Sequence, residues 1–480
     1  MNEPPIDVGS LTLAEAGAAF RRGQFSPLQL TTAYLQRIEQ LDPQLNSFIT
    51  VTADAALAAA KQATDELASG TDRGALHGIP IAYKDLIATA GIRTTSASRV
   101  HARRIPDADA TVVQALTAAG AISLGKLNML ECAYGVVHPD FGPALNPWRL
   151  THSSGGSSSG SAVAVAAGLC LAALGTDTGG SIRMPAGWCG IVGHKPTYGL
   201  VSRHGVDALS WSLDHVGPMT RSVQDAALLL EHMAGHDPLD PGSAPAAEFH
   251  AAELDAVDVR QLRVGVSRDM LDRHTDAEVR GIVDRALQQL GGCVGSIDVA
   301  ELPSNDELLE TEFVILFAEA AAIHQPWLRT RPSDYAPLTR ERLEAGSAIP
   351  AIHYIDAQRR RRVLVDQFAR LHERFDLLAL PSTPVPALGL EDTGLTINGE
   401  PGDALEAFIR VTGPFNVTGE PAVSVPCGWT SEGLPVGLQL AGRHFEDHLV
   451  LAAARAFETA HGEALRLPRS ALSPPAQVRA

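Results

Sequence analysis

The sequence lacks paired cysteines and long apolar runs. Its five cysteines are scattered, odd in number and never at CxxC spacing, which disfavours a disulfide framework or a zinc site and suits a reducing cytoplasm. The longest nearly apolar stretch, 162–175, is too short and too rich in glycine to cross a bilayer. The first ten residues show no basic and apolar signal pattern. We therefore expect a cytoplasmic location and no membrane partner.

Positive charge is also in short supply. The net charge of −17 repels phosphate backbones, so we expect no direct binding to nucleic acid. The basic run Arg359–Arg362 is best interpreted as a solvated helix face. The seventeen histidines include no HExxH pair, and we expect neither a metal nor an organic cofactor.

Lysine is rare in this sequence compared with arginine. Only four of the 38 basic residues are lysines: Lys61, Lys84, Lys126 and Lys195. Arginine stays charged in proteins, whereas lysine is able to lose its proton, so the few lysines are candidates for that task. Lys61 lies in an alanine-rich helical pattern and is predicted to be a surface residue. The other three fall within residues 75–220.

Apolar periodicity indicates the organisation of the chain. A length of 480 residues with 45% hydrophobic residues is ample for a buried core. We predict a single domain over 1–470, with a helical segment at about 10–70, a motif-bearing core at about 75–220 and a variable substrate-side region at about 235–370. The tail 471–480 is predicted to be disordered.

Helical and strand-like patterns alternate, which is typical of an α/β fold. Ser26 is the expected N-cap of a helix that begins with Pro27. A turn at Gly120 is expected to separate a helix from a short buried strand. GIPIAYKDLIA is expected to be a short strand that enters a loop, and SAVAVAAGLCLAALGTD a buried helix followed by a strand. Further strands are expected in the runs LRVGVSRD, DLLALPSTPVP, PAVSVPCG and LPVGLQLAG.

Two glycine- and serine-rich segments, 153–168 and 174–187, are the densest chemical signal. Such segments allow main-chain N–H groups to approach a ligand closely. A P-loop would need a lysine directly after the glycines, and none follows. GSSSG at 156–160 fits the hydrolase elbow GxSxG with Ser158 as nucleophile, but no apolar strand precedes it. A structural loop without chemistry stays open.

These segments, together with GIPIAYKD, GKLNMLECAYG, GHKPTYGLVSRHG, SLDHVGPMTRS and PFNVTGEPAVSVPCG, closely resemble the amidase signature family. The resemblance extends from about Leu11 to Thr459, and several independent motifs occur in the family's order. It implies a large twisted mixed β-sheet surrounded by helices. It also implies hydrolysis of amide C–N bonds through a serine, a second serine held by a cis peptide bond, and a lysine.

The resemblance places the three catalytic residues at Lys84, Ser157 and Ser181. In this scheme Lys84 takes a proton from Ser157 while Ser157 takes one from Ser181, and Ser181 attacks the carbonyl. A hydroxyl suits the bridging role because it both donates and accepts. Lys84 must be neutral near pH 7, which burial after the apolar run IPIAY favours and the adjacent Asp85 opposes.

The resemblance also assigns substrate-binding groups. The main-chain N–H groups of Thr178, Gly179 and Gly180, with that of Ser181, are expected to stabilise the oxyanion. Ala133, in the segment after the GKLN turn, is expected to line the pocket.

Four other charged residues are expected to have structural roles. Asp177 and Arg183 flank the nucleophile and are expected to brace its loop as an ion pair. Lys126 and Lys195 are expected to serve the fold, because no catalytic role of the family falls on them.

The sequence leaves three functions open: a stand-alone amidase, the glutaminase component of a tRNA-dependent amidotransferase, known as its A subunit, which releases ammonia from glutamine, and a non-catalytic scaffold. All three triad positions are filled, which disfavours the scaffold. The amidotransferase components carry a carboxylate just before the PxN segment; here Arg410 stands there, and no acid follows Glu406. The stand-alone amidase is therefore the favoured hypothesis.

The expected substrate is a small-molecule amide or carbamate, with esters as a further candidate, carrying a neutral acyl group and an apolar or aryl amine. An apolar wall, with little to hold a charged group, is expected from Met129, Leu130, Ala133, Tyr134 and Trp188. The oligomeric state stays open, with a homodimer as the candidate.

Overall fold

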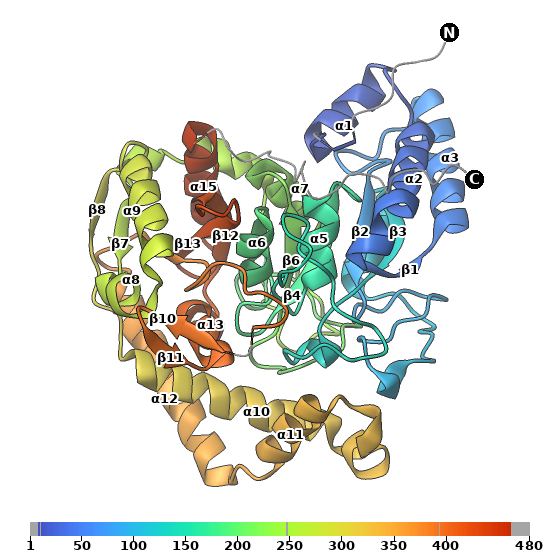
Figure 1. The fold of residues 1–480 in the computed structure, drawn as a ribbon. Helices are drawn as coiled ribbons and strands as arrows, with labels where there is room; N and C mark the ends of the chain where they lie inside the picture. The colour runs from blue at the N-terminus through green and yellow to red at the C-terminus, as the bar shows by residue number, and fades with distance from the viewer. Residues whose placement is uncertain (1–7, 10, 246–247, 393, 462–480) are drawn as a thin grey trace.

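The computed structural model describes residues 8–9, 11–245, 248–392 and 394–461. Within these residues eleven strands form one sheet, in the order β1-β3-β2-β4-β6-β5-β12-β13-β9-β7-β8 (Figure 1). The strands are β1 (Phe48–Val51), β2 (Pro80–Lys84), β3 (Ile122–Leu127), β4 (Ala172–Asp177), β5 (Val192–Lys195), β6 (His215–Thr220), β7 (Arg263–Val266), β8 (Ser296–Val299), β9 (Leu377–Pro381), β12 (Ala422–Trp429) and β13 (Pro435–Gly442). β10 (Leu395–Ile397) and β11 (Glu400–Gly402) form a separate hairpin.

Helices surround the sheet, which confirms the predicted α/β class with a mixed sheet (Figure 1). α10, α11 and α12 lie together at the bottom of the view, below the strands. The α-helices are α1 (Leu13–Arg21), α2 (Pro27–Leu45), α3 (Ala53–Ala68), α4 (Thr111–Ala118), α5 (Ser159–Ala166), α6 (Arg183–Cys189), α7 (Val223–Met233), α8 (Arg268–His274), α9 (Ala277–Gly291), α10 (Asn305–Thr330), α11 (Pro337–Ser347), α12 (Ala351–Leu371), α13 (Ala404–Thr412), α14 (Pro414–Thr418) and α15 (Asp447–His461). The short 3₁₀ segments are Arg99–His101, Glu131–Ala133, Ala251–Ala256, Val259–Gln261 and Pro332–Asp334.

The middle of the sheet positions the glycine- and serine-rich segments. β2 pairs in parallel with β4, with Tyr83 opposite Leu174. Parallel neighbours end at the same edge of a sheet, so the last residue of β2, Lys84, lies beside the end of β4. All eight residues of α5 are buried, as expected for a helix that is apolar or small on every side. This helix begins two residues after Ser157 and packs on both strands.

Local signals in the sequence were informative for several elements. Ser26 caps α2 and forms a capping box with Gln29, and Pro27 is the first helical residue. Gly120 has a φ of +90° between α4 and β3, as the turn there requires. The expectation of helices alone over about 10–70 was wrong at β1, because four residues between two helices leave almost no periodicity to detect.

Some expectations fall outside these observations. The tail 471–480 lies outside the described residues. The single domain over 1–470 stays a prediction. No helix in the described part of the chain combines the length and apolarity needed to cross a bilayer.

Candidate active site

The Lys84 side chain is fully buried at the end of β2 and is surrounded by hydroxyl groups. Its Nζ forms hydrogen bonds with Ser157 Oγ at 2.7 Å, with Thr176 Oγ1 at 2.8 Å and with Ser158 Oγ at 2.9 Å. The structure therefore brings together Lys84 and Ser157, which lie 73 positions apart in the chain.

This environment favours a neutral amine. Burial lowers the pKa of Lys84 from 10.5 to about 7, although the charges of Asp177 and Asp214 oppose the shift. Asp85 does not hold the proton on Lys84, because its carboxylate instead accepts hydrogen bonds from the backbone and hydroxyl of Thr95.

The two adjacent serines have different surroundings. The Gly156–Ser157 peptide bond is cis, and Ser157 lines a pocket that also contains Ser181. Ser158 is fully buried, and its hydroxyl bonds to the carbonyl and the N–H of Thr176. Because Ser158 faces the protein interior, its hydroxyl has no access to a substrate. This excludes Ser158 as an elbow nucleophile.

Ser181 lies on the loop between β4 and α6, and a buried ion pair stabilises this loop. Arg183 forms a fully buried ion pair with Asp177 at 2.8 Å. Burial opposes ionisation of Asp177, but the charge of Arg183 and several hydrogen bonds outweigh it and keep the pKa of this carboxyl below its usual range. The same carboxylate accepts the N–H groups of Gly180 and Ile182. The predicted bracing role of this pair is confirmed.

The loop presents three main-chain donors rather than four. The N–H groups of Thr178, Gly179 and Ser181 have no acceptor among the described residues. Gly180 was also expected to donate to an oxyanion, and this was wrong, because its N–H bonds to Asp177 Oδ1 at 2.8 Å. The sequence pattern alone does not show which of four consecutive N–H groups turns inward.

Ser181 opens into a cavity of about 350 Å³, which we call the nucleophile pocket. Ala133 lines it as predicted, and Met129 is the one member of the expected apolar wall that does not. The apolar side chains of the lining are Leu130, Ala133, Tyr134, Met184, Trp188, Leu209, Leu316, Leu388, Leu390, Ala404, Leu405, Phe408 and Ile409.

The expectation that this pocket has little to hold a charged group of the substrate was wrong, because Arg342 of α11 lines it. Its Nη1 donates to the carbonyl of Tyr134 at 2.7 Å, and within the described residues it has no carboxylate partner. Asp392 also lines the pocket and accepts the N–H of Gly389. The sequence gives no signal that Arg342 lines the pocket, because α11 lies outside every motif.

Two buried groups beside the site were likewise missed. Thr176 contacts Lys84, and it was visible in the sequence only as part of GTDTGGS. Glu312 of α10 is buried behind the nucleophile loop, where a Cβ added at Gly179 would lie 2.7 Å from its Oε1. Burial raises the pKa of Glu312 well above its usual range, which favours the neutral form of this carboxyl.

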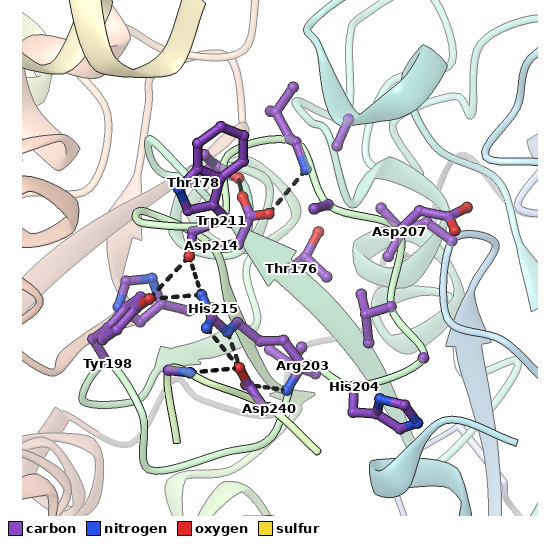
Figure 2. A pocket seen from close by; sticks show the side chains of 18 of the residues that line it. Thr176, Thr178, Tyr198, Arg203, His204, Asp207, Trp211, Asp214, His215 and Asp240 are labelled. Atoms are coloured by element: carbon purple, nitrogen blue, oxygen red, sulfur yellow. Dashed lines mark hydrogen bonds and ion pairs between the residues drawn. The ribbon is translucent and has the colours of Figure 1, made fainter. Parts of the chain in front are cut away.

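A second cavity of about 550 Å³ lies beside the nucleophile pocket (Figure 2). The two share Ala133, Thr178 and Leu209 in their linings. In Figure 2, Asp214 bonds to Thr178, and Arg203 pairs with Asp240.

The other three lysines lie away from both cavities. Lys126 donates to the carbonyl of Ile87, and Lys195 donates to the carbonyl of Glu420 at 2.6 Å. Lys61 is exposed, as predicted, and pairs with Asp65. The described residues contain no cluster of three or more side chains suited to hold a metal ion.

Comparisons with known proteins agree with this site. The sequence profile of the family described as Amidase matches residues 29–451. The A subunit of the glutamyl-tRNA(Gln) amidotransferase of Moorella thermoacetica is 39% identical, over 93% of this chain and 96% of that protein. A Mycobacterium tuberculosis protein that bears the name amidase AmiD is also 39% identical, over 96% of each. A crystal structure of an amidase superposes with a TM-score of 0.86 at 36% identity, covering 94% of this chain and 100% of the other.

Proposed function

Because the chain belongs to the amidase family, whose members hydrolyse amide bonds, we propose that it is a stand-alone hydrolase of linear amides that forms an acyl-enzyme on Ser181. The observation that carries the proposal is the 2.7 Å hydrogen bond between Lys84 Nζ and Ser157 Oγ, inside a fully buried site next to the pocket of Ser181. A buried amine with a pKa of about 7 is a suitable base at neutral pH.

The reaction proceeds in two halves. Neutral Lys84 accepts the Ser157 proton as Ser157 accepts the Ser181 proton, and Ser181 Oγ adds to the amide carbonyl. The N–H groups of Thr178, Gly179 and Ser181 are the donors available to the oxyanion. When the C–N bond breaks, the nitrogen takes its proton from Ser157, which is reprotonated by Lys84. Water then adds to the ester and releases the acid through the same relay.

The pocket supports a refined substrate class. Its wall is largely apolar, and Arg342 supplies a cation that has no carboxylate partner among the described residues, so its remaining donors suit a planar anion. We therefore propose an apolar acyl group that carries a carboxylate, in place of the neutral acyl group expected from the sequence. Carbamates share the carbonyl and the leaving group, and we extend the proposal to them.

The second candidate function is that of the glutaminase component of an amidotransferase, which the relative from Moorella thermoacetica favours. Against it, α13 turns Ala404, Leu405 and Phe408 toward the pocket and offers no acid for the ammonium of glutamine, and the acid elsewhere in the lining, Asp392, accepts the N–H of Gly389. Arg410 points elsewhere and pairs with Asp306 and Glu406.

The test compares the purified chain alone on three substrates: a carboxylate-bearing anilide, its neutral counterpart and free glutamine. We expect the first to have the highest kcat/KM. Turnover of glutamine above both anilides, or activity only after partner proteins are added, would replace this proposal with the amidotransferase.

A further inference from the structure

The second cavity adjoins the site at which a substrate must lie. It shares the lining residues Ala133, Thr178 and Leu209 with the nucleophile pocket. Of these, Thr178 lies on the nucleophile loop, three positions before Ser181. A substrate carbonyl held by the loop N–H groups therefore has one cavity on each side of Thr178. An amide has two halves, and the two cavities differ in chemistry.

The wall of the second cavity carries a carboxylate without a cation. Asp214 accepts hydrogen bonds from the Thr178 hydroxyl at 2.6 Å and from the N–H groups of Leu209 and Ser210, but it has no ion-pair partner among the described residues (Figure 2). The other acids of the lining are neutralised. Asp240 pairs with Arg203, and Asp207 pairs with Arg104.

A buried imidazole, that of His215, also belongs to this lining. His215 Nδ1 lies 2.7 Å from the carbonyl of Leu213, so Nδ1 carries the hydrogen and donates it. The ring packs edge-on against Tyr198, with 5.6 Å between the ring centroids. Its Nε2 is itself buried and does not open into the cavity, which leaves the carboxylate of Asp214 as the acceptor at this wall.

Resting on the proposed hydrolysis at Ser181, we propose that the second cavity receives the amine half of the substrate while the acyl half occupies the nucleophile pocket. Its acceptor, the carboxylate of Asp214, fits amines that carry a further N–H donor or an ammonium. The nucleophile pocket differs, because its wall is largely apolar and carries the cation of Arg342 as well as the carboxylate of Asp392.

The assignment also gives the leaving group a path. When the C–N bond breaks, the nitrogen takes the Ser157 proton and the amine enters the second cavity, while the acyl group stays on Ser181. Trp211 at this cavity is 46% exposed, so the amine is able to reach solvent there without passing the acyl group.

The chain offers a matched pair of variants. Ala208 lines only the second of the two cavities and Ala404 only the nucleophile pocket, and both are half-buried alanines. We expect Ala208→Phe to lower kcat/KM by about tenfold or more for anilides and benzylamides, and by less than about threefold for the primary amide of the same acid. Ala404→Phe should instead discriminate within a series of growing acyl groups at constant amine.

Sensitivity of Ala208→Phe to acyl size, or equal losses across the amine series, overturns the assignment. Asp214→Asn should lower kcat/KM about tenfold for an amide whose amine half carries an ammonium, relative to its neutral isostere, since it removes a charge-assisted hydrogen bond. An equal effect on both amides contradicts the role of that charge.

The wild-type enzyme provides a test that does not depend on folding of a variant. A free amine and a free carboxylic acid, added together as inhibitors, should bind at the same time. Mutually exclusive inhibition overturns the assignment. If no amide is hydrolysed at all, the proposed function fails; if amides are hydrolysed but the two inhibitors exclude each other, only this inference fails.

Discussion

Replacing Lys84 with arginine tests the base of the relay most sharply. Lys84→Arg keeps a cation in the buried site but removes the neutral state, because the pKa of arginine exceeds 12. At pH 8 about nine-tenths of Lys84 is neutral with its pKa of about 7, whereas roughly one guanidinium in 10⁴ is neutral. We therefore expect kcat to fall by about 10⁴-fold, equivalent to about 5.5 kcal/mol of barrier.

The assay is release of nitroaniline by the purified variant, with circular dichroism to verify the fold. Lys126→Arg is the matched control, because Lys126 is as deeply buried and its pKa is also lowered, to about 8. It contacts Ile87, Thr89 and Thr94 rather than the triad. The folded fraction of this control should keep kcat within about threefold. Turnover by Lys84→Arg within tenfold of wild type would refute the reasoning.

Three further predictions follow from the site. The kcat/KM of the wild-type enzyme should rise with pH through about 7 and level off above it, since the folded-state pKa of Lys84 is lowered and only the neutral amine acts as a base; a flat profile from pH 5 to 9 would exclude this base. Gly180→Ala should cost activity by about 100-fold or more, on the order of a lost oxyanion contact, because φ is +117° there and the new Cβ would lie 2.3 Å from Thr412 Oγ1. Gly70→Ala, also at positive φ but in open space, is its control, and equal kcat losses in the two would exclude the clash as the cause. Arg342→Gln should raise KM about tenfold for a carboxylate-bearing amide and leave its neutral counterpart unchanged, and a uniform change in KM would exclude recognition of the carboxylate.

The elements that carry the triad were predictable from local patterns. GIPIAYK is a short apolar run, and SAVAVAAG is a buried helix directly after a glycine- and serine-rich loop. Parallel pairing of β2 with β4 then places Lys84 beside Thr176. The ion pair of Asp177 with Arg183 was also predictable, because six residues across a tight loop bring the two together.

Other features depend on contacts between distant segments. Arg342 reaches the nucleophile pocket from α11, and the periodicity of a helix does not show which exposed arginine faces a cavity. The inward turn of the Gly180 N–H depends on where the Asp177 carboxylate lies. The second cavity is assembled from residues around 203–216 and 239–242, and the motifs GHKPTYGLVSRHG and SLDHVGPMTRS, which overlap the first of these ranges, do not show that they enclose a cavity.

The identity of the nucleophile is the central claim, and covalent trapping tests it most directly. The wild-type enzyme is treated with an aryl sulfonyl fluoride until activity is lost, and the adduct is mapped by peptide mass spectrometry. Ser181 faces the nucleophile pocket and sits beside free N–H donors, so we expect a single adduct on Ser181. Loss of activity with Ser181 unmodified, and the adduct on Ser157 or Ser158, would contradict the account.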